Sequence, residues 1–261
     1  MSEQQQPVSE QQPFRWVSAA ATHVGKVRQV NEDALLERGD IGLWAVADGM
    51  GGHHAGDVAS SSIVNILDDI QPSTRLSAYV DEVEDRILAI NDRLRQMAAE
   101  HEDNRTIGST IVAMIAQSSH CAFLWAGDSR VYRSRDDICL QLTKDHSQVE
   151  EMVQQGLILR EDAEQHPAAN IITRAVGASD NLYIDVDIQE LMEGDTFLLC
   201  SDGLYKHITD EEISELLKTN NINDIPHQLI NTTLERGAID NVTVIAVRAL
   251  RPKKVLANNN N

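Results

Sequence analysis

The chain has 261 residues, and 42% of them are hydrophobic, which is enough for a sizeable core in one large domain or two small ones. Its 22 basic and 41 acidic residues give a formal net charge of −19, which argues against nucleic acid or an anionic membrane as a partner and is compatible with binding cations. The start of the chain lacks the basic and apolar parts of a secretory signal, and no uninterrupted apolar run reaches the roughly 18 residues of a membrane span, so we expect a cytoplasmic protein.

Short apolar runs typical of strands occur between two polar tails, at residues 1–13 and 251–261. In chain order the runs are RWVSAAATH, IGLWAVA, STIVAMIA, CAFLWAG, RVYRS, YIDVDI, TFLLCS and VTVIAVRAL. One long, mostly polar segment interrupts them and exceeds the length of an ordinary connection. We therefore expect a single domain over residues 14–250 with a flap at about residues 146–180.

Helices are expected in consecutive pairs. Apolar residues at helical spacing predict helices over residues 57–69 and 81–100. A third helix begins at Thr209, which forms a capping box with Glu212, and a fourth opens at Asp224 with a proline in its first turn. Because strands cluster with strands and helices with helices, we expect a layered α+β fold with antiparallel sheets.

Four aspartates stand at the ends of apolar runs. Asp48, Asp128 and Asp202 end the runs WAVADG, FLWAGDS and FLLCSDG, and Asp240 directly precedes VTVIAV. A carboxylate beside a core is costly unless a partner compensates its charge, and cations are the obvious partners. The alternative for each single aspartate is an ordinary turn.

The ligand chemistry favours Mg²⁺ or Mn²⁺, which prefer oxygen ligands. Two such ions sharing one carboxylate can hold a hydroxide for attack on a phosphoryl group. The cysteines stand in separate apolar runs without a CxxC pair, which disfavours zinc and copper. They are expected to be buried free thiols, namely Cys121, Cys139 and Cys200.

The glycines that follow the first aspartate suit a metal site. Gly49 has no Cβ, so its carbonyl can approach an ion, and Gly51 and Gly52 permit a tight turn into the next helix. The adjacent His53 and His54 can donate protons near neutral pH, or they can have a structural role.

Two residues upstream add a candidate phosphate site. Arg28 can bind two phosphate oxygens at once, although a lone arginine can equally be a solvated surface charge. Asp33 can orient a metal-bound water, or it can be an ordinary turn acid.

With these pieces assembled, the sequence resembles the bacterial branch of the PPM family, the metal-dependent serine/threonine protein phosphatases of type 2C. The resemblance spans about residues 16–249. Its motifs, in order, are GKVRQVNEDA, VADGMGGHHAG, GSTIVAM, WAGDSRVY, TKDHS, HPAANIITRAVG, LLCSDGL and DNVTVIAV.

The resemblance implies a set of metal ligands. Asp48 would bridge two Mn²⁺ or Mg²⁺ ions, with the Gly49 carbonyl as a further ligand. Asp202 and Asp240 would bind the first ion, and Asp128 with Asp202 would bind a third, weaker one.

The resemblance also implies a fold, an activity and partners. The fold would be a sandwich of two antiparallel sheets flanked by pairs of helices. Hydroxide held by the metals would attack phosphoserine or phosphothreonine directly, with Arg28 binding the phosphate and Asp33 supporting the water. The partners would be phosphorylated proteins, namely a serine/threonine kinase and its substrates. We expect a monomer that binds neither nucleic acid nor membrane.

One position departs from the family. Many eukaryotic members have a histidine after the Asp-Gly pair as a proposed general acid, whereas Met50 stands here. His53, His146, His166 or a metal-bound water are the candidate proton donors.

Two other functions remain as hypotheses. One is an inactive scaffold that binds phosphoproteins, against which the presence of every metal aspartate argues. The other is a partner-switching regulator, which needs a sensor domain that these 261 residues do not contain but a separate chain can supply.

Overall fold

The structure is a computed structural model that describes residues 14–51, 55–100 and 106–251. The two predicted tails lie outside these residues, apart from Arg251.

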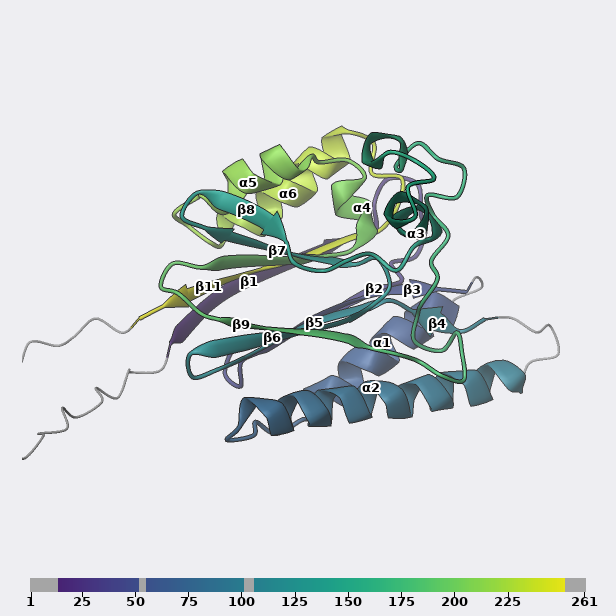
Figure 1. Cartoon of the computed structure of the whole chain (residues 1–261), viewed down its shortest axis with the longest axis horizontal. Coiled ribbons are helices and arrows are strands. Elements are labelled where there is room, and N and C mark those ends of the chain that lie inside the picture. The colour runs from purple at the N-terminus through teal and green to yellow at the C-terminus, as the bar shows by residue number, and fades with distance from the viewer. Residues whose placement is uncertain (1–13, 52–54, 101–105, 252–261) are drawn as a thin grey trace, which may run out of the picture.

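Two antiparallel sheets lie face to face in the described chain (Figure 1). The first sheet has the strand order β1 (Arg15–His23), β11 (Val242–Leu250), β10 (Thr196–Cys200), β7 (Arg130–Arg135) and β8 (Ile138–Gln141). The second has the order β2 (Asp33–Arg38), β3 (Leu43–Met50), β5 (Ile111–Gln117), β6 (His120–Ala126) and β9 (Asp185–Glu190), and the short β4 (Gly108–Ser109) pairs with β3. The expected layered α+β fold is confirmed.

A pair of helices covers the outer face of each sheet (Figure 1). The second sheet is covered by α1 (Ala55–Asp68) and α2 (Leu76–Ala99), and the first by α5 (Asp210–Leu217) and α6 (Asp224–Glu235). The remaining helices are the short α3 (Gln148–Gln154), a 3-10 helix at Arg160–Asp162, and α4 (Asp202–Tyr205). The four layers therefore run helix, sheet, sheet, helix.

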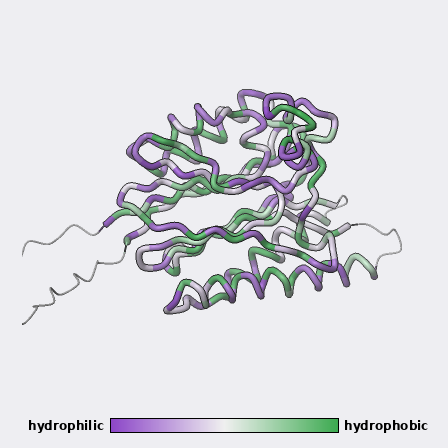
Figure 2. The backbone as a smooth tube through the Cα atoms, viewed as in Figure 1, coloured by the Kyte–Doolittle hydropathy of each residue, from purple (hydrophilic) through white to green (hydrophobic). Residues whose placement is uncertain are grey.

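The central strands have an apolar side chain on both faces. In β3, Trp44 and Val46 pack between the sheets against residues such as Phe197, whereas Ala45 and Ala47 pack under the helices. Figure 2 shows hydrophobic stretches along these strands and alternating colours along the helices. Because both faces are covered, these strands appear in the sequence as continuous apolar runs.

The predicted elements agree with the structure where the apolar pattern is strong. All eight runs contain strands, and the capping box joins the Thr209 backbone N–H to Glu212 Oε2 at 3.0 Å. Helix α2 starts at Leu76, five residues before the predicted helix, because its buried stripe extends back to Tyr79.

Five elements were not predicted, namely β2, β8, α3, the 3-10 helix at Arg160–Asp162 and α4. The two strands lie at sheet edges, where charged or exposed side chains interrupt the apolar pattern, and α4 is only four residues long. The prediction of buried thiols is correct for Cys121 and Cys200, while Cys139 is only partly buried.

Within the described residues, no helix combines the length and the apolar character needed to cross a membrane.

Candidate active site

Two aspartates face each other across the first strand pair of the second sheet. Asp33 opens β2 and stands directly opposite Asp48 of β3 in the antiparallel register. Side chains at directly opposite positions lie close together, and like charges there destabilise a sheet. A pair of carboxylates at this position therefore needs compensation.

The other three aspartates come from the segments around the first sheet. Asp128 lies between β6 and β7, Asp202 begins α4 directly after β10, and Asp240 precedes β11. Because β10 lies between β7 and β11, these three positions come to the same end of that sheet.

The charges of the five aspartates act on one another. Burial raises the pKa of Asp48 well above its ordinary value, and the negative charges of Asp33, Asp202, Asp128 and Asp240 raise it further, in decreasing order. Burial also raises the pKa of Asp128 to about 7, with Asp202 as the next cause. We call these five residues the carboxylate cluster.

Hydroxyl groups hold the Asp33 side chain. The Ser201 hydroxyl donates to Asp33 Oδ2 at 2.8 Å, and the same hydroxyl oxygen accepts the Thr243 backbone N–H at 3.0 Å. Burial raises the pKa of Asp33 to about 7, although the side chains of Thr243 and Ser201 favour its charged form. The Asp33 carboxylate is therefore fixed in place beside Asp48.

Basic side chains contact two members of the carboxylate cluster. Arg28 donates from its guanidinium to Asp240 Oδ2 at 2.8 Å, while about half of the Arg28 side chain is exposed. The Lys206 ammonium contacts Asp202 Oδ2. Arg28 is thus at the solvent edge of the carboxylate cluster, where an incoming phosphate can reach it.

The donor chemistry of the carboxylate cluster fits divalent ions. Asp128 is buried, and its Oδ1 atom has no hydrogen-bond partner among the described residues. In the described ranges, no three His, Cys, Asp or Glu side chains converge closely enough to hold one ion as they stand. This is consistent with two ion pairs in the cluster, because Asp202 contacts Lys206 and Asp240 contacts Arg28. As they stand the carboxylates do not form a metal site, and Asp202 and Asp240 would have to turn away from Lys206 and Arg28 to bind metal.

Gly49 is required by packing as well as by its candidate ligand role. A Cβ on Gly49 would lie 2.1 Å from the Gly56 carbonyl oxygen at the start of α1. Gly51 has a φ of 141°, which disfavours other residues and agrees with the predicted turn. Gly52 and His54 lie outside the described residues.

The histidine candidates occupy different surroundings. His146 is buried, accepts the Gly127 backbone N–H through Nδ1, and has its Nε2 3.2 Å from Asp185 Oδ2. Burial lowers the pKa of His146. His166 accepts the Ala168 backbone N–H within the flap, and His53 lies outside the described residues.

The predicted flap is a loop with a closed base. The Thr173 backbone N–H donates to the His146 carbonyl at 2.8 Å, and the Gln148 N–H donates to the Ile171 carbonyl at 2.9 Å. The loop has its own small apolar cluster, built from Val149, Ala163 and Ala168, with Val153, Ile158 and Ala169 against it. The segment is therefore more ordered internally than its polar sequence indicates.

Sequence reasoning missed two neighbours of the carboxylate cluster, Ser201 and Lys206. Ser201 contacts Asp33 from 168 positions away, which no local pattern reveals. Lys206 follows Asp202 by four residues, a spacing that brings side chains together on a helix, but α4 was not predicted. No lysine is adjacent to these aspartates in sequence, and Lys206 nevertheless reaches one in space.

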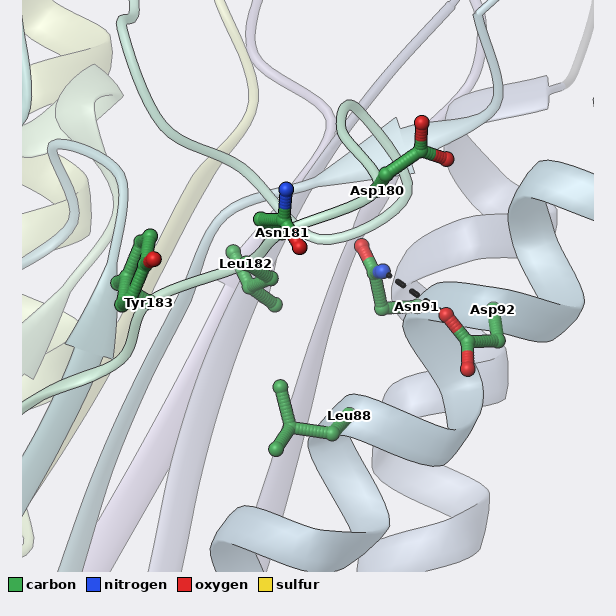
Figure 3. Close-up of a pocket in the computed structure, with 7 residues that line it drawn as sticks. All are labelled: Leu88, Asn91, Asp92, Asp180, Asn181, Leu182 and Tyr183. Atoms are coloured by element: carbon green, nitrogen blue, oxygen red, sulfur yellow. Dashed lines mark hydrogen bonds between the residues drawn. The ribbon is translucent and has the colours of Figure 1, made fainter.

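A separate hollow of about 280 Å³ shares no residue with the carboxylate cluster (Figure 3). It lies between α2 and the segment before β9. Its lining residues are Leu88, Asn91, Asp92, Asp180, Asn181, Leu182 and Tyr183. These are carboxylates, amides and apolar groups without a basic side chain, so the hollow does not suit a phosphate.

Comparisons with known proteins agree on one family. The model of the family described as Protein phosphatase 2C matches residues 22–235. The serine/threonine phosphatase stp of Listeria innocua is 36% identical over 234 residues, which cover 87% of this chain and 93% of that protein.

Solved structures are similar over nearly the whole described fold. PppA, a key regulatory component of the T6SS in Pseudomonas aeruginosa, has 40% identity and a TM-score of 0.84, covering 91% of this chain and 99% of its own. The catalytic domain of the phosphatase PstP, solved with two manganese ions, has 33% identity and a TM-score of 0.81 over the same shares.

The raised pKa of Asp128 predicts a pH-dependent stability in the presence of a chelator. An aspartate with a pKa near 4 when unfolded and about 7 when folded costs stability as pH rises through this range, and the cost is complete above it. Asp128→Asn should therefore raise the free energy of unfolding at pH 8 by on the order of 1 to 3 kcal/mol, and with it the melting temperature. At pH 4 the substitution should have little effect on either.

The control for this experiment is Asp85→Asn, which changes an exposed aspartate of α2. Its melting temperature should follow the parent protein at both pH values. An Asp128→Asn protein that is no more stable than the parent at pH 8 would contradict the assignment of buried charge.

Proposed function

The chain belongs to the protein phosphatase 2C family, and we propose that its active site is the carboxylate cluster, with Arg28 at its edge. As a member of this family it is a divalent-metal-dependent serine/threonine protein phosphatase that acts on phosphoproteins. One observation carries the proposal, namely the buried Asp48 among four other carboxylates with a basic side chain at the solvent edge.

We propose that two Mn²⁺ or Mg²⁺ ions bind here. Asp48 would be the shared ligand and the Gly49 carbonyl a further one, and Asp202 and Asp240 would complete the set. When bound, the ions would polarise the phosphoryl oxygens and lower the pKa of water, so that a nucleophile is present at neutral pH. The five carboxylates supply the negative charge that makes such binding favourable.

The chain's own residues then bind and orient the substrate. The Arg28 guanidinium can exchange its contact with Asp240 for the phosphate oxygens, because more than half of its side chain is exposed. Asp33, held by the Ser201 hydroxyl, would accept a hydrogen bond from the attacking water. These roles correspond to direct hydrolysis without a phosphoenzyme.

The proton donor to the leaving alcohol is a further part of the proposal. Both ring nitrogens of His146 are engaged by Gly127 and Asp185, which leaves none free for a leaving group. His166 accepts a backbone N–H through Nδ1 alone, so its Nε2 can still carry a proton. We therefore assign this proton to His53, His166 or water.

The remaining parts of the proposal concern the partners and the domain. We propose that the chain acts as a monomer, opposes a serine/threonine kinase and has a regulatory role, as PppA has in its own system. Residues 14–250 would form the phosphatase domain, with residues 146–180 as the flap that borders the substrate.

Metal dependence tests this function. Release of phosphate from a phosphothreonine peptide should stop in excess chelator and return with Mn²⁺ or Mg²⁺. Asp48→Asn should lower kcat by orders of magnitude while the melting temperature in chelator is not lowered, because the shared ligand is lost and the fold is not. Full turnover in excess chelator would refute the proposed site.

The contribution of Arg28 to phosphate binding can be measured separately from that of the metals. Arg28→Ala should lower kcat/KM roughly tenfold, mainly through KM, because the guanidinium already binds the phosphate of the ground state. Lys26→Ala, which removes an exposed charge on the same loop, is the matched control and should have a much smaller effect. Equal KM values for Arg28→Ala and the parent enzyme would show that Arg28 is only a surface charge.

The flap should select protein substrates without affecting the chemistry. Leu157 and Leu159 of the flap are each more than 60% exposed and can contact a substrate, whereas Arg160 and Gln154 bond Glu150 and support the flap itself. Leu157→Ser with Leu159→Ser should lower kcat/KM for a phosphoprotein about three- to tenfold, because apolar contact area is lost.

The same double variant should hydrolyse a small aryl phosphate within roughly twofold of the parent enzyme. Ile138→Ser with Leu140→Ser, two exposed residues of β8, is the control and should change neither rate. Equal losses on both substrates would mean that the flap supports the catalytic centre.

A further inference from the structure

The strand β9 is a free edge of the second sheet. Among the described strands it is the last of that sheet, and it pairs with β6 alone. The Leu191 backbone N–H donates to the Ser119 carbonyl at 2.8 Å, which sets the alternation of hydrogen bonds along the two strands. By this alternation the backbone N–H and C=O groups of Val186 and Ile188 point away from β6. They can therefore pair with a further strand.

The side chains of the same two residues continue an exposed apolar stripe. The partners of Val186 and Ile188 on β6 are Leu124 and Ala122, which pack under the helices. Val186 and Ile188 therefore lie on the face that α2 covers, but they are still 40% and 53% exposed. Tyr183, which comes shortly before β9, is 70% exposed. The edge thus offers apolar side chains next to free backbone groups.

The hollow in Figure 3 extends this stripe towards α2. Leu88 of α2 and Tyr183 line it, and so do the carboxylates of Asp92 and Asp180. Arg95 pairs with Asp180. We call Tyr183, Val186 and Ile188, together with this hollow, the β9 edge.

The charges of β9 indicate what kind of chain can bind beside it. Its residues include Asp185, Asp187 and Glu190 and no basic residue. Two copies of the protein paired along β9 would bring these like charges together, which destabilises a sheet. Asp185 and Asp187 lie on the opposite face of the strand from Val186 and Ile188, because side chains alternate. A chain with basic side chains on one face and apolar ones on the other therefore complements β9.

The strand also begins beside the flap. Asp185 accepts a hydrogen bond from Arg174 at 2.7 Å, and its Oδ2 lies 3.2 Å from His146 Nε2. Both partners belong to the flap near its closed base. The His146 backbone N–H in turn donates to the carbonyl of Gly127, the residue before Asp128. A chain bound along β9 is thus directed towards the flap and the carboxylate cluster.

We propose that the β9 edge is a docking site for an extended segment of a phosphoprotein substrate, in which basic and apolar side chains alternate. The segment would add to the sheet as a further strand, with its apolar side chains against Val186 and Ile188 and its basic ones on the side of Asp187. The inference rests on the proposed function and adds a feature of the substrates. A basic segment would also assist the approach of an anionic phosphoprotein to a chain with a net charge of −19.

Binding of a synthetic peptide tests the docking site without phosphate and without metal. The probe is a short fluorescein-labelled peptide in which lysine and valine alternate, and its anisotropy is measured with the full chain in excess chelator at about 0.15 M salt. The parent protein should bind this peptide about tenfold more tightly than a peptide of the same composition with all lysines before the valines, because only alternation matches both faces of β9. Equal binding of the two peptides would overturn the proposal.

Variants of β9 locate the bound peptide. Val186→Ser with Ile188→Ser should weaken binding about tenfold, because the apolar contact is lost. Ile188→Pro removes a backbone N–H that points away from β6, and it should weaken binding by a similar factor. If Ile188→Pro does not fold, the serine pair decides.

The matched control is Ile138→Ser with Leu140→Ser on β8, which is the edge strand of the first sheet and also has exposed apolar residues. It should bind the alternating peptide within roughly twofold of the parent protein. A loss as large as that of the β9 serine pair would show that the peptide is held by charge alone and would overturn the proposal.

Phosphate release shows whether the bound partner is a substrate. A phosphothreonine peptide linked flexibly to the alternating segment should have a KM about tenfold below that of the same peptide linked to the block segment. Val186→Ser with Ile188→Ser should remove this difference and leave hydrolysis of a small aryl phosphate unchanged. Equal KM values on the parent enzyme would refute substrate docking.

These measurements also separate the docking site from the proposed function. Full turnover in excess chelator would contradict the metal site around Asp48, whereas the anisotropy measurement in chelator depends on neither metal nor phosphate. Failure of the parent protein to bind the alternating peptide would overturn the docking site and leave the proposed active site unaffected.

Discussion

Repulsion among five aspartates at one end of the two sheets is the interaction on which the rest of this structure depends. Two carboxylates about 4 Å apart repel by roughly 4 kcal/mol at an effective dielectric constant near 20, and burial adds a further cost. In the described residues, Arg28 and Lys206 form ion pairs with only two of the five. The fold tolerates this cost because three apolar layers hold the strands that carry the aspartates.

The carboxylate cluster depends on both sheets of the sandwich. Asp33 and Asp48 belong to the second sheet, and Asp128, Asp202 and Asp240 flank strands of the first, so neither sheet alone provides the carboxylate cluster. Packing between the sheets, through side chains such as Trp44 and Phe197, fixes how the two groups face each other. Loss of that packing would separate the charges and remove the capacity to bind cations.

Much of the site could be predicted from the sequence because its signals are local. An aspartate at the end of an apolar run is visible within six or seven residues, and the charges of Asp128, Asp202 and Asp240 all raise the pKa of Asp48, as expected for neighbours. Their role as metal ligands stays a prediction. Asp33 was less evident, because its strand is a sheet edge with charged residues and its importance follows from its register with Asp48.

The rest could not be predicted because it depends on pairings between distant segments. Ser201 reaches Asp33 only once β2 and β10 lie in opposing sheets. Lys206 is close to Asp202 in sequence, but their contact depends on α4. A helix of four residues is too short to show a helical pattern in the sequence. The flap appeared structureless because its apolar residues form a cluster only among themselves, around Val149.

The most direct test of the account is a crystal structure of the full chain with Mn²⁺, in which anomalous scattering locates the ions. The account predicts two manganese peaks against Asp48, with Asp202 and Asp240 turned towards them. Manganese bound elsewhere, for example at Asp92 and Asp180 of the separate hollow, with none against Asp48, would contradict it.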